Sequence, residues 1–191
     1  MYIPPYKIVA IGASAGGINA ISKLLASLGS NFPVGIVVVQ HLPRQYPSYL
    51  AHIFGRITTL TVKEAANGDL IRSGSVLIAP PNYHVLVNSK GVIALSQAAK
   101  VNYVRPSVDV LFESIAQSYQ QKVIAVILSG TGIDGKSGVW AIAANGGKVI
   151  VQSPQSSQYK GMPEAAISTK IVDYIVPLDL IAPTLEDLVS K

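Results

Sequence analysis

The sequence predicts an α/β fold: a doubly wound, mostly parallel sheet with helices on both faces and an inserted antiparallel hairpin. Short, fully apolar runs at residues 8–11, 34–39 and 123–128 are typical of strands buried on both faces of a parallel sheet. Amphipathic segments with helical spacing alternate with these runs, and this alternation favours a parallel sheet covered by helices on both sides. Glycine-rich turns follow the first and the last of the three runs.

The first strand, at residues 8–11, leads into a glycine-rich turn and then a helix. We expect an extended lead-in at residues 2–6 and a helix at residues 18–28, where apolar residues recur at helical spacing. The turn spells G-A-S-A-G, which fits the G-x-S-x-G nucleophile elbow that lifts a serine hydroxyl above the sheet. The serine is Ser14.

Two other interpretations of this turn stay open. Glycines between a strand and a helix also let a pyrophosphate approach a helix N-terminus, although the G-x-G-x-x-G spacing is missing and the second strand lacks an acidic ribose ligand at its end. Alternatively, the glycines only pack a helix against the sheet. A Walker A loop is excluded, because no Gly-Lys-Ser/Thr follows.

The second strand, at residues 34–39, ends in Gln40 and His41, so the histidine lies where ligands collect in doubly wound sheets. A helix is expected at residues 48–56 and a short strand at 60–63. Three short apolar runs then follow, separated by turn residues, and they indicate the inserted antiparallel hairpin. These runs are residues 76–79, 84–87 and 92–95.

The second half of the chain repeats the strand-turn-helix pattern. Ser107 is the expected N-cap of a helix that ends near Tyr119, and Asp109 is favourable in its first turn. The apolar strand at 123–128 ends in S-G-T-G-I-D-G, a glycine-rich turn that carries Asp134. The remaining expected elements are helices at 137–144, 163–168 and 178–189, a strand at 148–151 and an edge strand at 171–176.

Composition excludes several classes of protein. The net charge is +5, but the basic residues are scattered singly without interleaved aromatic residues, so we expect no nucleic-acid binding. The chain has no cysteine, which removes disulfides and thiolate catalysis. No apolar run reaches the roughly 18 residues that span a bilayer and no signal-peptide pattern opens the chain, so we expect a cytoplasmic protein without membrane insertion.

Three predicted strand ends carry a hydroxyl, an imidazole and a carboxylate, on Ser14, His41 and Asp134. A serine hydroxyl becomes a good nucleophile when an imidazole takes its proton, and a carboxylate orients that imidazole. Each residue also has a simpler interpretation, as a helix cap for Ser14 and Asp134 and as a loop residue for His41. The parallel topology favours the catalytic interpretation of the three residues, because it brings the three strand ends to one edge of the sheet.

The other candidate residues point to structural roles. His52 falls in a predicted helix and His84 in the hairpin, and neither belongs to a metal-binding spacing, so we expect no metal and no cofactor. Trp140, between Val139 and Ala141 on a predicted helix, is expected in the core.

Several motifs in order resemble the catalytic domain of the chemotaxis protein-glutamate methylesterases, the CheB family. They are I-G-A-S-A-G-G at 11–17, V-V-Q-H-L-P at 38–43, I-A-P-P-N at 78–82, R-P-S-V-D-V-L-F at 105–112, S-G-T-G-I-D-G at 129–135 and Y-K-G-M-P at 159–163. The resemblance covers nearly the whole chain and implies a doubly wound α/β domain. It also implies Ser14 as nucleophile, His41 as general base and Asp134 as its orienting acid.

The same resemblance implies hydrolysis of γ-glutamyl methyl esters on the cytoplasmic helices of chemoreceptors, in signalling adaptation, and in some members deamidation of receptor glutamines. Backbone amides near Ala15 and Thr131 are the expected oxyanion hole. Many relatives carry Thr and Met at these two positions. With Ala15 and Thr131, this chain instead resembles the subgroup in which the esterase is fused to the receptor methyltransferase.

The resemblance also sets expectations for organisation and partners. We expect one methylesterase domain over residues 1–191, without the phosphorylatable receiver domain that usually precedes it. Methylated chemoreceptors are the expected partners, together with a receptor methyltransferase or a separate receiver. The alternative is a catalytically idle module of the same fold that docks on the receptors or on the methyltransferase.

Overall fold

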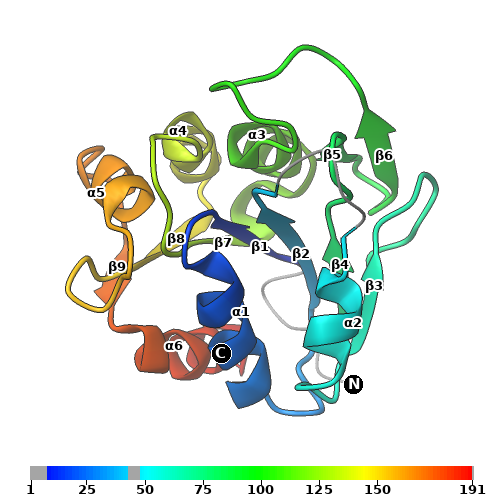
Figure 1. Ribbon diagram of the computed structural model, residues 1–191, viewed down its shortest axis with the longest axis horizontal. Helices are drawn as coiled ribbons and strands as arrows, with labels where there is room; N and C mark the ends of the chain where they lie inside the picture. Colours follow the sequence, from blue (N-terminus) through cyan, green and yellow to red (C-terminus); the bar gives the residue numbers. More distant parts are fainter. Residues whose placement is uncertain (1–7, 43–47, 191) are drawn as a thin grey trace.

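A seven-stranded parallel sheet forms the centre of the protein (Figure 1), in a computed structural model that describes residues 8–42 and 48–190. The lead-in predicted at residues 2–6 lies outside the described residues. The strand order is β3-β4-β2-β1-β7-β8-β9, and every neighbouring pair is parallel. The strands are β1 (Ile8–Ala13), β2 (Gly35–Gln40), β3 (Thr61–Glu64), β4 (Ser75–Ile78), β7 (Val123–Ile127), β8 (Lys148–Gln152) and β9 (Tyr174–Val176).

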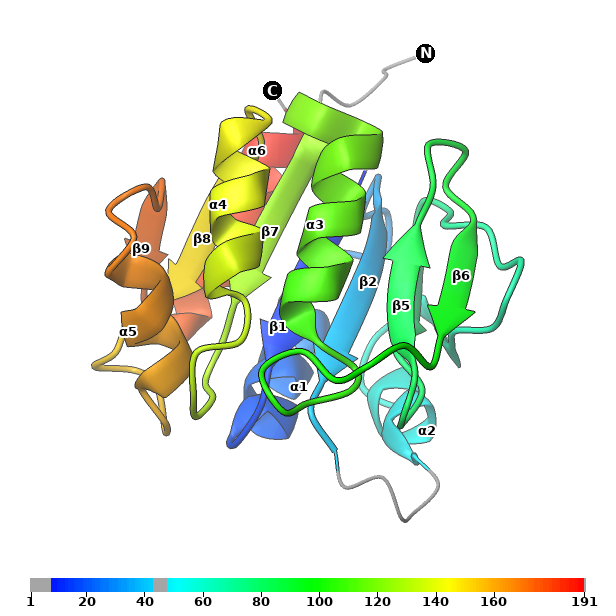
Figure 2. The ribbon, with the colours of Figure 1, turned by 90° about the horizontal axis from the view of Figure 1, so that it is seen from above.

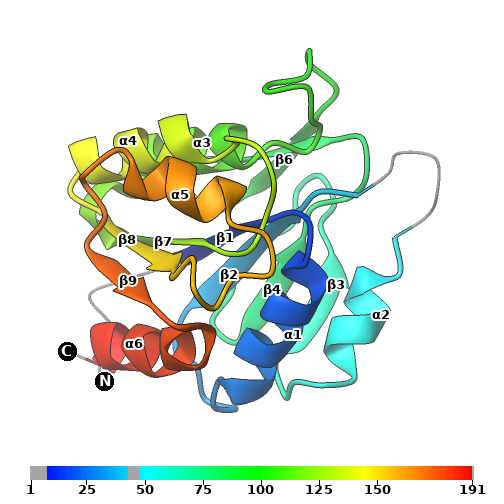
Figure 3. The same cartoon turned by 60° about the vertical axis from the view of Figure 1, so that its left-hand side comes forward.

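Helices cover both faces of this sheet (Figures 1 and 3). One face carries α3 (Val108–Tyr119), α4 (Lys136–Ala144) and α5 (Gly161–Ile167), and the other carries α1 (Gly17–Ser27), α2 (Leu50–Gly55) and α6 (Leu178–Ser190). A short 3-10 helix, Gln120–Lys122, follows α3. The doubly wound α/β class predicted from the sequence is therefore confirmed.

The central strand β1 shows how the sequence builds two cores. All six of its residues are buried, as expected for a strand covered on both faces. Its side chains alternate, so Val9 and Ile11 join the apolar cluster under α1 and α6, while Ile8 and Ala10 join the cluster under α3 and α4. Each of these side chains therefore contributes to one core or the other.

The inserted hairpin consists of β5 (His84–Val87) and β6 (Ile93–Ser96), which pair antiparallel and lie beside α3 (Figure 2). Of the three runs that indicated this hairpin, the first forms no part of it. That run is β4, which pairs parallel with β2 and β3 inside the main sheet. The partner of a four-residue strand depends on contacts far along the chain, which its local pattern does not encode.

One expectation about a side chain is corrected. Trp140 was predicted in the core, but it is 51% exposed, because α4 buries the stripe of Gly138, Val139 and Ile142 instead. Asp109 lies in the first turn of α3 as predicted, and its carboxylate also accepts a hydrogen bond from the Gly138 amide of α4.

The chain changes direction across the sheet next to β1. On one side of β1 the sheet continues with β2, β4 and β3. The chain then returns past β1 and forms β7, β8 and β9 on the other side. In doubly wound sheets, ligands bind at the carboxyl ends of the strands at such a switch point. The segment that joins β6 to α3 passes this end of the sheet (Figure 2). None of the described helices is both long and apolar enough to cross a membrane.

Candidate active site

Ser14 lies in the tight turn between β1 and α1, as the elbow pattern predicted. Its amide donates to Ser129 O at 3.0 Å, and its carbonyl accepts from the Gly17 amide at 2.9 Å. Gly16, which precedes α1, has a φ of 73°, a left-handed conformation that glycine adopts without steric cost. The turn is thus fixed from both the neighbouring strand end and the helix.

His41 follows β2 directly and is tied to the Ser14 turn. Its amide donates to Ala13 O at 3.0 Å, which continues the pairing of β1 with β2. The buried side chain of Gln40 donates through Nε2 to Ser14 O at 2.8 Å and to His41 O at 3.0 Å. Gln40 therefore holds the backbones of both residues in one arrangement.

Asp134 follows β7 in the second glycine-rich turn, and it is only 4% exposed. Its two oxygens lie at the N-terminus of α3, where they accept from the Val108 amide at 2.6 Å and the Asp109 amide at 3.3 Å. Helix N-termini favour anions because their first amides lack helical partners. Asp134 therefore caps α3, and not the helix that follows it in sequence.

The ionisation of Asp134 is controlled by its surroundings. Burial alone would raise the pKa of this carboxyl, but hydrogen bonds from His41, the Val108 amide, Asn102 and Ser107 together hold the pKa below its ordinary value. The side chain of Asn102 donates at 3.0 Å and the hydroxyl of Ser107 at 2.7 Å. Asp134 is thus a carboxylate at neutral pH, although it is buried.

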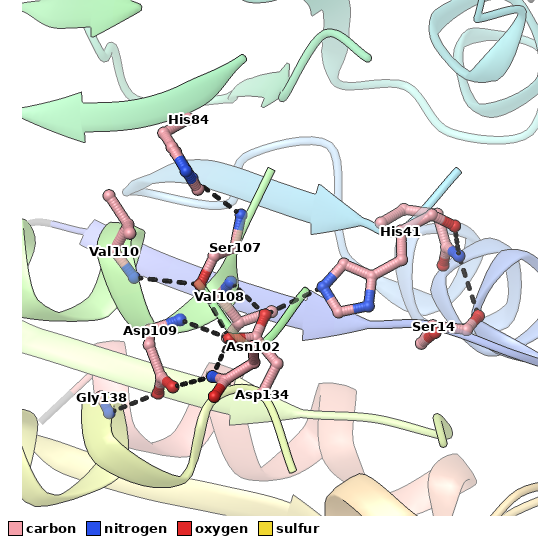
Figure 4. A network of polar contacts seen from close by, with 11 residues as sticks. Ser14, His41, His84, Asn102, Ser107, Val108, Asp109, Val110, Asp134 and Gly138 are labelled. Atoms are coloured by element: carbon pink, nitrogen blue, oxygen red, sulfur yellow. Dashed lines mark hydrogen bonds and ion pairs between the residues drawn. The ribbon is translucent and has the colours of Figure 1, made fainter. Parts of the chain in front are cut away.

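The His41 ring is joined to Asp134 through Nε2 and Oδ2 at 2.9 Å, the hydrogen bond that the sequence predicted (Figure 4). Because a carboxylate only accepts, Nε2 carries the proton in neutral His41, and Nδ1 keeps a lone pair. In Figure 4, Nδ1 lies on the side of the ring that faces Ser14. The ring is therefore used the other way round from the chymotrypsin pattern, in which Nδ1 faces the carboxylate.

The predicted hydrogen bond between His41 and the Ser14 hydroxyl is not present among residues 8–42 and 48–190. The three residues nevertheless line one pocket of about 270 Å³. Hydrogen bonds of this kind are often long without substrate and tighten when it binds. The pocket is lined by Ser14, His41, Asn102, Tyr103, Val104, Thr131, Gly132, Ile133 and Asp134.

Larger hollows elsewhere lack this combination of residues. One of about 500 Å³ lies between α1 and α6 and is lined by Lys23 and Asp179 among others, with no histidine. In the described part of the chain, no cluster of three or more His, Asp and Glu side chains could hold a metal ion. Only the pocket at the strand ends brings a hydroxyl, an imidazole and a carboxylate together among the hollows described.

Two backbone amides beside the Ser14 turn are candidates for binding an oxyanion. Within the described residues, the amides of Ala15 and Thr131 donate to no protein acceptor, whereas the neighbouring amides of Ser14 and Gly130 do. Thr131 lines the pocket, and Ala15 directly follows Ser14. In α/β-hydrolases the amide after the nucleophile is one of the oxyanion donors.

Sequence reasoning missed a second buried carboxylate in this network. Asp109 is 3% exposed and accepts from the Gly138 amide at 2.7 Å and from Asn102 at 2.7 Å. Burial, together with the charges of Asp134 and Glu113, raises the pKa of Asp109 to about 6. The one available signal for Asp109 was its position two residues after Ser107 in the R-P-S-V-D motif. This position indicated only the start of a helix.

The two remaining histidines have different environments. His52 is exposed on α2. His84 is buried, accepts from the Ser107 amide at 3.2 Å through Nδ1, and lies 3.0 Å from Ala99 O through Nε2. Its ring therefore supports both ends of the segment that leads into α3.

An open parallel sheet with a serine turn and a partly buried, carboxylate-bound histidine at its switch point is typical of an α/β hydrolytic enzyme. The family model described as CheB methylesterase matches residues 9–185. The crystal structure of the Thermotoga maritima CheB methylesterase catalytic domain superposes with a TM-score of 0.92 at 38% identity, covering 96% of this chain and 99% of that one. This chain belongs to the CheB methylesterase family.

Curated relatives agree with this assignment. A Leptospira interrogans protein is 40% identical over 177 residues, which cover 93% of this chain and 92% of the relative. The protein-glutamate methylesterase/protein-glutamine glutaminase of Moorella thermoacetica is 39% identical over 191 residues, covering 98% of this chain and 45% of the relative. The present chain thus spans about half the length of the Moorella protein.

Proposed function

We propose that this protein hydrolyses γ-glutamyl methyl esters on the cytoplasmic helices of chemoreceptors, releasing glutamate and methanol in signalling adaptation. Ser14 is the nucleophile, His41 the general base and Asp134 the residue that orients His41. The observation that carries the proposal is the 2.9 Å hydrogen bond between His41 and Asp134 in the pocket that Ser14 also lines. Membership of the CheB methylesterase family supports the substrate class.

In the first half of the reaction, the Ser14 hydroxyl attacks the ester carbonyl, and Nδ1 of His41 takes its proton. The carbonyl oxygen becomes an oxyanion that the amides of Ala15 and Thr131 are placed to bind, and one such donor is usually worth about 3 kcal/mol. Collapse of the tetrahedral intermediate expels methoxide, which leaves as methanol with the proton from His41. The glutamyl group remains as an ester on Ser14.

The second half repeats these roles with water. His41 takes a proton from a water molecule, which attacks the acyl-enzyme carbonyl. The new tetrahedral intermediate collapses, His41 returns its proton to Ser14, and the glutamate side chain is freed as the carboxylic acid, which loses its proton to water. Asp134 keeps its charge throughout and stabilises the imidazolium that forms in each half.

The test is methanol release from methylated chemoreceptor membranes by the wild type and by Ser14→Ala. The wild type is expected to release methanol and Ser14→Ala none above background, because the acyl-enzyme cannot form. The matched control is Ser27→Ala on the following helix, whose hydroxyl donates only to Lys23 O at 2.9 Å and whose activity should equal that of the wild type.

The outcomes separate the proposal from its alternative. Full activity in Ser14→Ala would exclude the serine mechanism. No release by any variant, together with retention of the protein on receptor membranes, would instead favour a catalytically idle module that docks on receptors or on the methyltransferase.

The same site suits a second leaving group. Attack by Ser14 on a receptor glutamine side chain would expel ammonia in place of methanol, and the name of the Moorella relative includes protein-glutamine glutaminase. Ammonia release from receptors that carry glutamine at the methylation sites tests this activity. Loss of both activities in Ser14→Ala would place them at one site, whereas ammonia release by Ser14→Ala would separate them.

The organisation of the protein enters the proposal as well. The family match over residues 9–185 supports one methylesterase catalytic domain across the described chain. Besides methylated receptors, we infer a receptor methyltransferase or a separate phosphorylatable receiver as partner. Co-purification of either with the receptor-bound protein, compared with receptor membranes alone, tests this part of the proposal.

A further inference from the structure

One side-chain amide links the two buried carboxylates of the site (Figure 4). Asn102 Nδ2 lies 3.0 Å from Asp134 Oδ1 and 2.7 Å from Asp109 Oδ2. An amide nitrogen carries two hydrogens, so it can donate one to each carboxylate at the same time. A continuous path therefore runs from His41 through Asp134 and Asn102 to Asp109, and it ends on the Gly138 amide.

Two buried carboxylates this close together disfavour carrying charge at the same time. Both acceptor oxygens lie within 3.0 Å of the same nitrogen, and both side chains are less than 5% exposed. Their hydrogen-bond partners are unequal. Among the described residues and apart from Asn102, Asp134 accepts from four donors, whereas Asp109 accepts from the Gly138 amide alone.

The groups around the pair favour charge on Asp134 over charge on Asp109. Asp134 faces His41 from the end of β2 and the amides at the start of α3, which favour its charge. Burial, the Asp134 charge and, on its own helix, Glu113 raise the pKa of Asp109. The Gly138 amide from α4 and the Asn102 amide oppose this rise only in part. A proton taken up by the pair is therefore held by Asp109.

The backbone of the segment is shaped to bring the Asn102 amide inward. Asn102 and Tyr103 both have positive φ, 50° and 64°, and Val101 and Val104 exchange backbone hydrogen bonds across them at 3.3 and 3.0 Å. Such two-residue turns favour asparagine. Arg105 holds the preceding backbone by donating to the carbonyls of Gln97 and Ala98, both at 2.6 Å. Unusual backbone conformations persist where the surroundings impose them, often at functional sites.

We propose that Asn102 is a positioning residue of the esterase site. Its amide donates to both carboxylates and so helps Asp134 stay the charged partner of His41, while Asp109, which has fewer donors, takes any shared proton. In this role Asn102 acts through Asp134. The inference rests on the proposed function, because it assigns His41 as the general base.

The first test is Asn102→Gly, since glycine accepts the positive φ and removes only the side chain. Without the amide, the pKa of Asp134 rises, so the part of the acid limb of the kcat profile that reports protonation of Asp134 moves up by about one pH unit. Below that part of the limb, turnover then falls about tenfold, with KM within about twofold of the wild type. A purely structural role would lower kcat at all pH values without moving the limb.

The second test is rescue by Asn102→Gly combined with Asp109→Asn. The added substitution removes the competing charge, and its new amide keeps an oxygen for the Gly138 hydrogen bond. We expect the acid limb of the double variant to return toward that of the wild type. An acid limb that stays where the single variant has it, or moves further up, would overturn the proposal. The control Asn145→Ala, which removes one bond to Ala141 O on α4, should leave the profile unchanged.

A measurement without turnover separates this inference from the proposed function. The ¹³Cγ resonances of Asp109 and Asp134 are followed against pH in the wild type and in Asn102→Gly. We expect Asp109 to titrate at higher pH than Asp134 in the wild type, and both titrations to move to higher pH in the variant because each carboxylate loses a donor. This shift without methanol release by the wild type would reject the esterase and keep the charge arrangement. Methanol release with unchanged titrations would keep the esterase and reject the role of Asn102.

Discussion

At the scale of single residues, the site depends on which atom of each side chain is used. The Nε2 atom of His41 is committed to Asp134, and this leaves Nδ1 as the only ring atom that can take a proton from Ser14. Asp134 selects this tautomer because, among the described residues, five donors from three parts of the chain hold it as a carboxylate. Removing its charge should therefore affect catalysis more than folding.

We predict that Asp134→Asn lowers kcat by about three to four orders of magnitude, because an amide at this position no longer fixes the His41 tautomer or stabilises the imidazolium. Methanol release measures the loss, and circular dichroism checks the fold. The control is Asp173→Asn, a carboxylate that also accepts from a backbone amide, that of Val149, but lies outside the pocket. A loss of less than tenfold in Asp134→Asn would contradict the assigned role.

At the scale of elements, the contact between α1 and the end of β2 sets the position of the Ser14 turn. A Cβ at Gly17 would lie 2.1 Å from Gln40 Oε1 and 2.6 Å from the Ala13 Cβ. Gln40 Oε1 is also the one buried side-chain acceptor without a partner among the described residues, so Gln40 is held by packing and by its Nε2 bonds.

We predict that Gly17→Ala destabilises the protein by about 1–3 kcal/mol, as overpacking of a core usually does. It should also lower kcat by about a hundredfold, because Gln40 must shift and the Ser14 and His41 backbones move with it. Urea unfolding and methanol release measure the two effects. Gly29→Ala is the control, since its Cβ would come no closer than 3.5 Å to Glu186, and its stability should stay within about 0.5 kcal/mol.

Ser107 joins the start of α3 to the turn that carries Asp134. Its hydroxyl donates to Asp134 Oδ1 at 2.7 Å and accepts from the Val110 amide at 3.5 Å, so the predicted N-cap is confirmed. We predict that Ser107→Ala lowers the free energy of unfolding by about 1–2 kcal/mol. Ser118 lies on the same helix and donates one hydrogen bond, to Val87 O, so Ser118→Ala should lower the free energy of unfolding by less. Equal losses in thermal or urea unfolding would show that the bond to Asp134 adds nothing.

The limits of sequence prediction also appear at this scale. The fully apolar runs identified β1, β2 and β7 because burial on both faces leaves a strong local pattern. The pairing of β4 and the bridge from Asn102 to Asp109 escaped prediction, since both depend on residues brought together by the tertiary fold. Trp140 was misplaced because α4 is apolar on most sides, and only the spacing of Val139 and Ile142 marks its buried stripe. The catalytic roles of Ser14, His41 and Asp134 stay predictions.

At the scale of the whole molecule, Asp109 couples global stability to pH. Its pKa is about 6 in the folded protein and near 3.8 in the unfolded chain, so between these values the folded state binds the extra proton. The stabilisation is complete below about pH 4 and is lost as the pH rises through 6. The pKa of Asp134 is shifted the other way, so its contribution is lost only when the pH falls below its ordinary range.

We predict that the free energy of unfolding of the wild type falls by about 2–3 kcal/mol between pH 4 and 7 relative to Asp109→Asn. Urea unfolding at fixed pH values gives the free energy of unfolding of both proteins. The change of this free energy with pH is compared rather than its absolute value, because the substitution also changes a hydrogen bond with Asn102. If the free energy of unfolding changes equally with pH in the wild type and in Asp109→Asn, the raised pKa of Asp109 is contradicted.

The central place of β1 has a consequence for the time course of local opening. The strand is paired on both edges and wholly buried, so its amides exchange with solvent hydrogen only when the whole molecule unfolds. The Asn102 turn, closed by two bonds between Val101 and Val104, opens far more often. Deuterium uptake is therefore expected to be slow in β1, which leads into the Ser14 turn, and faster in the Asn102 turn that lines the same pocket.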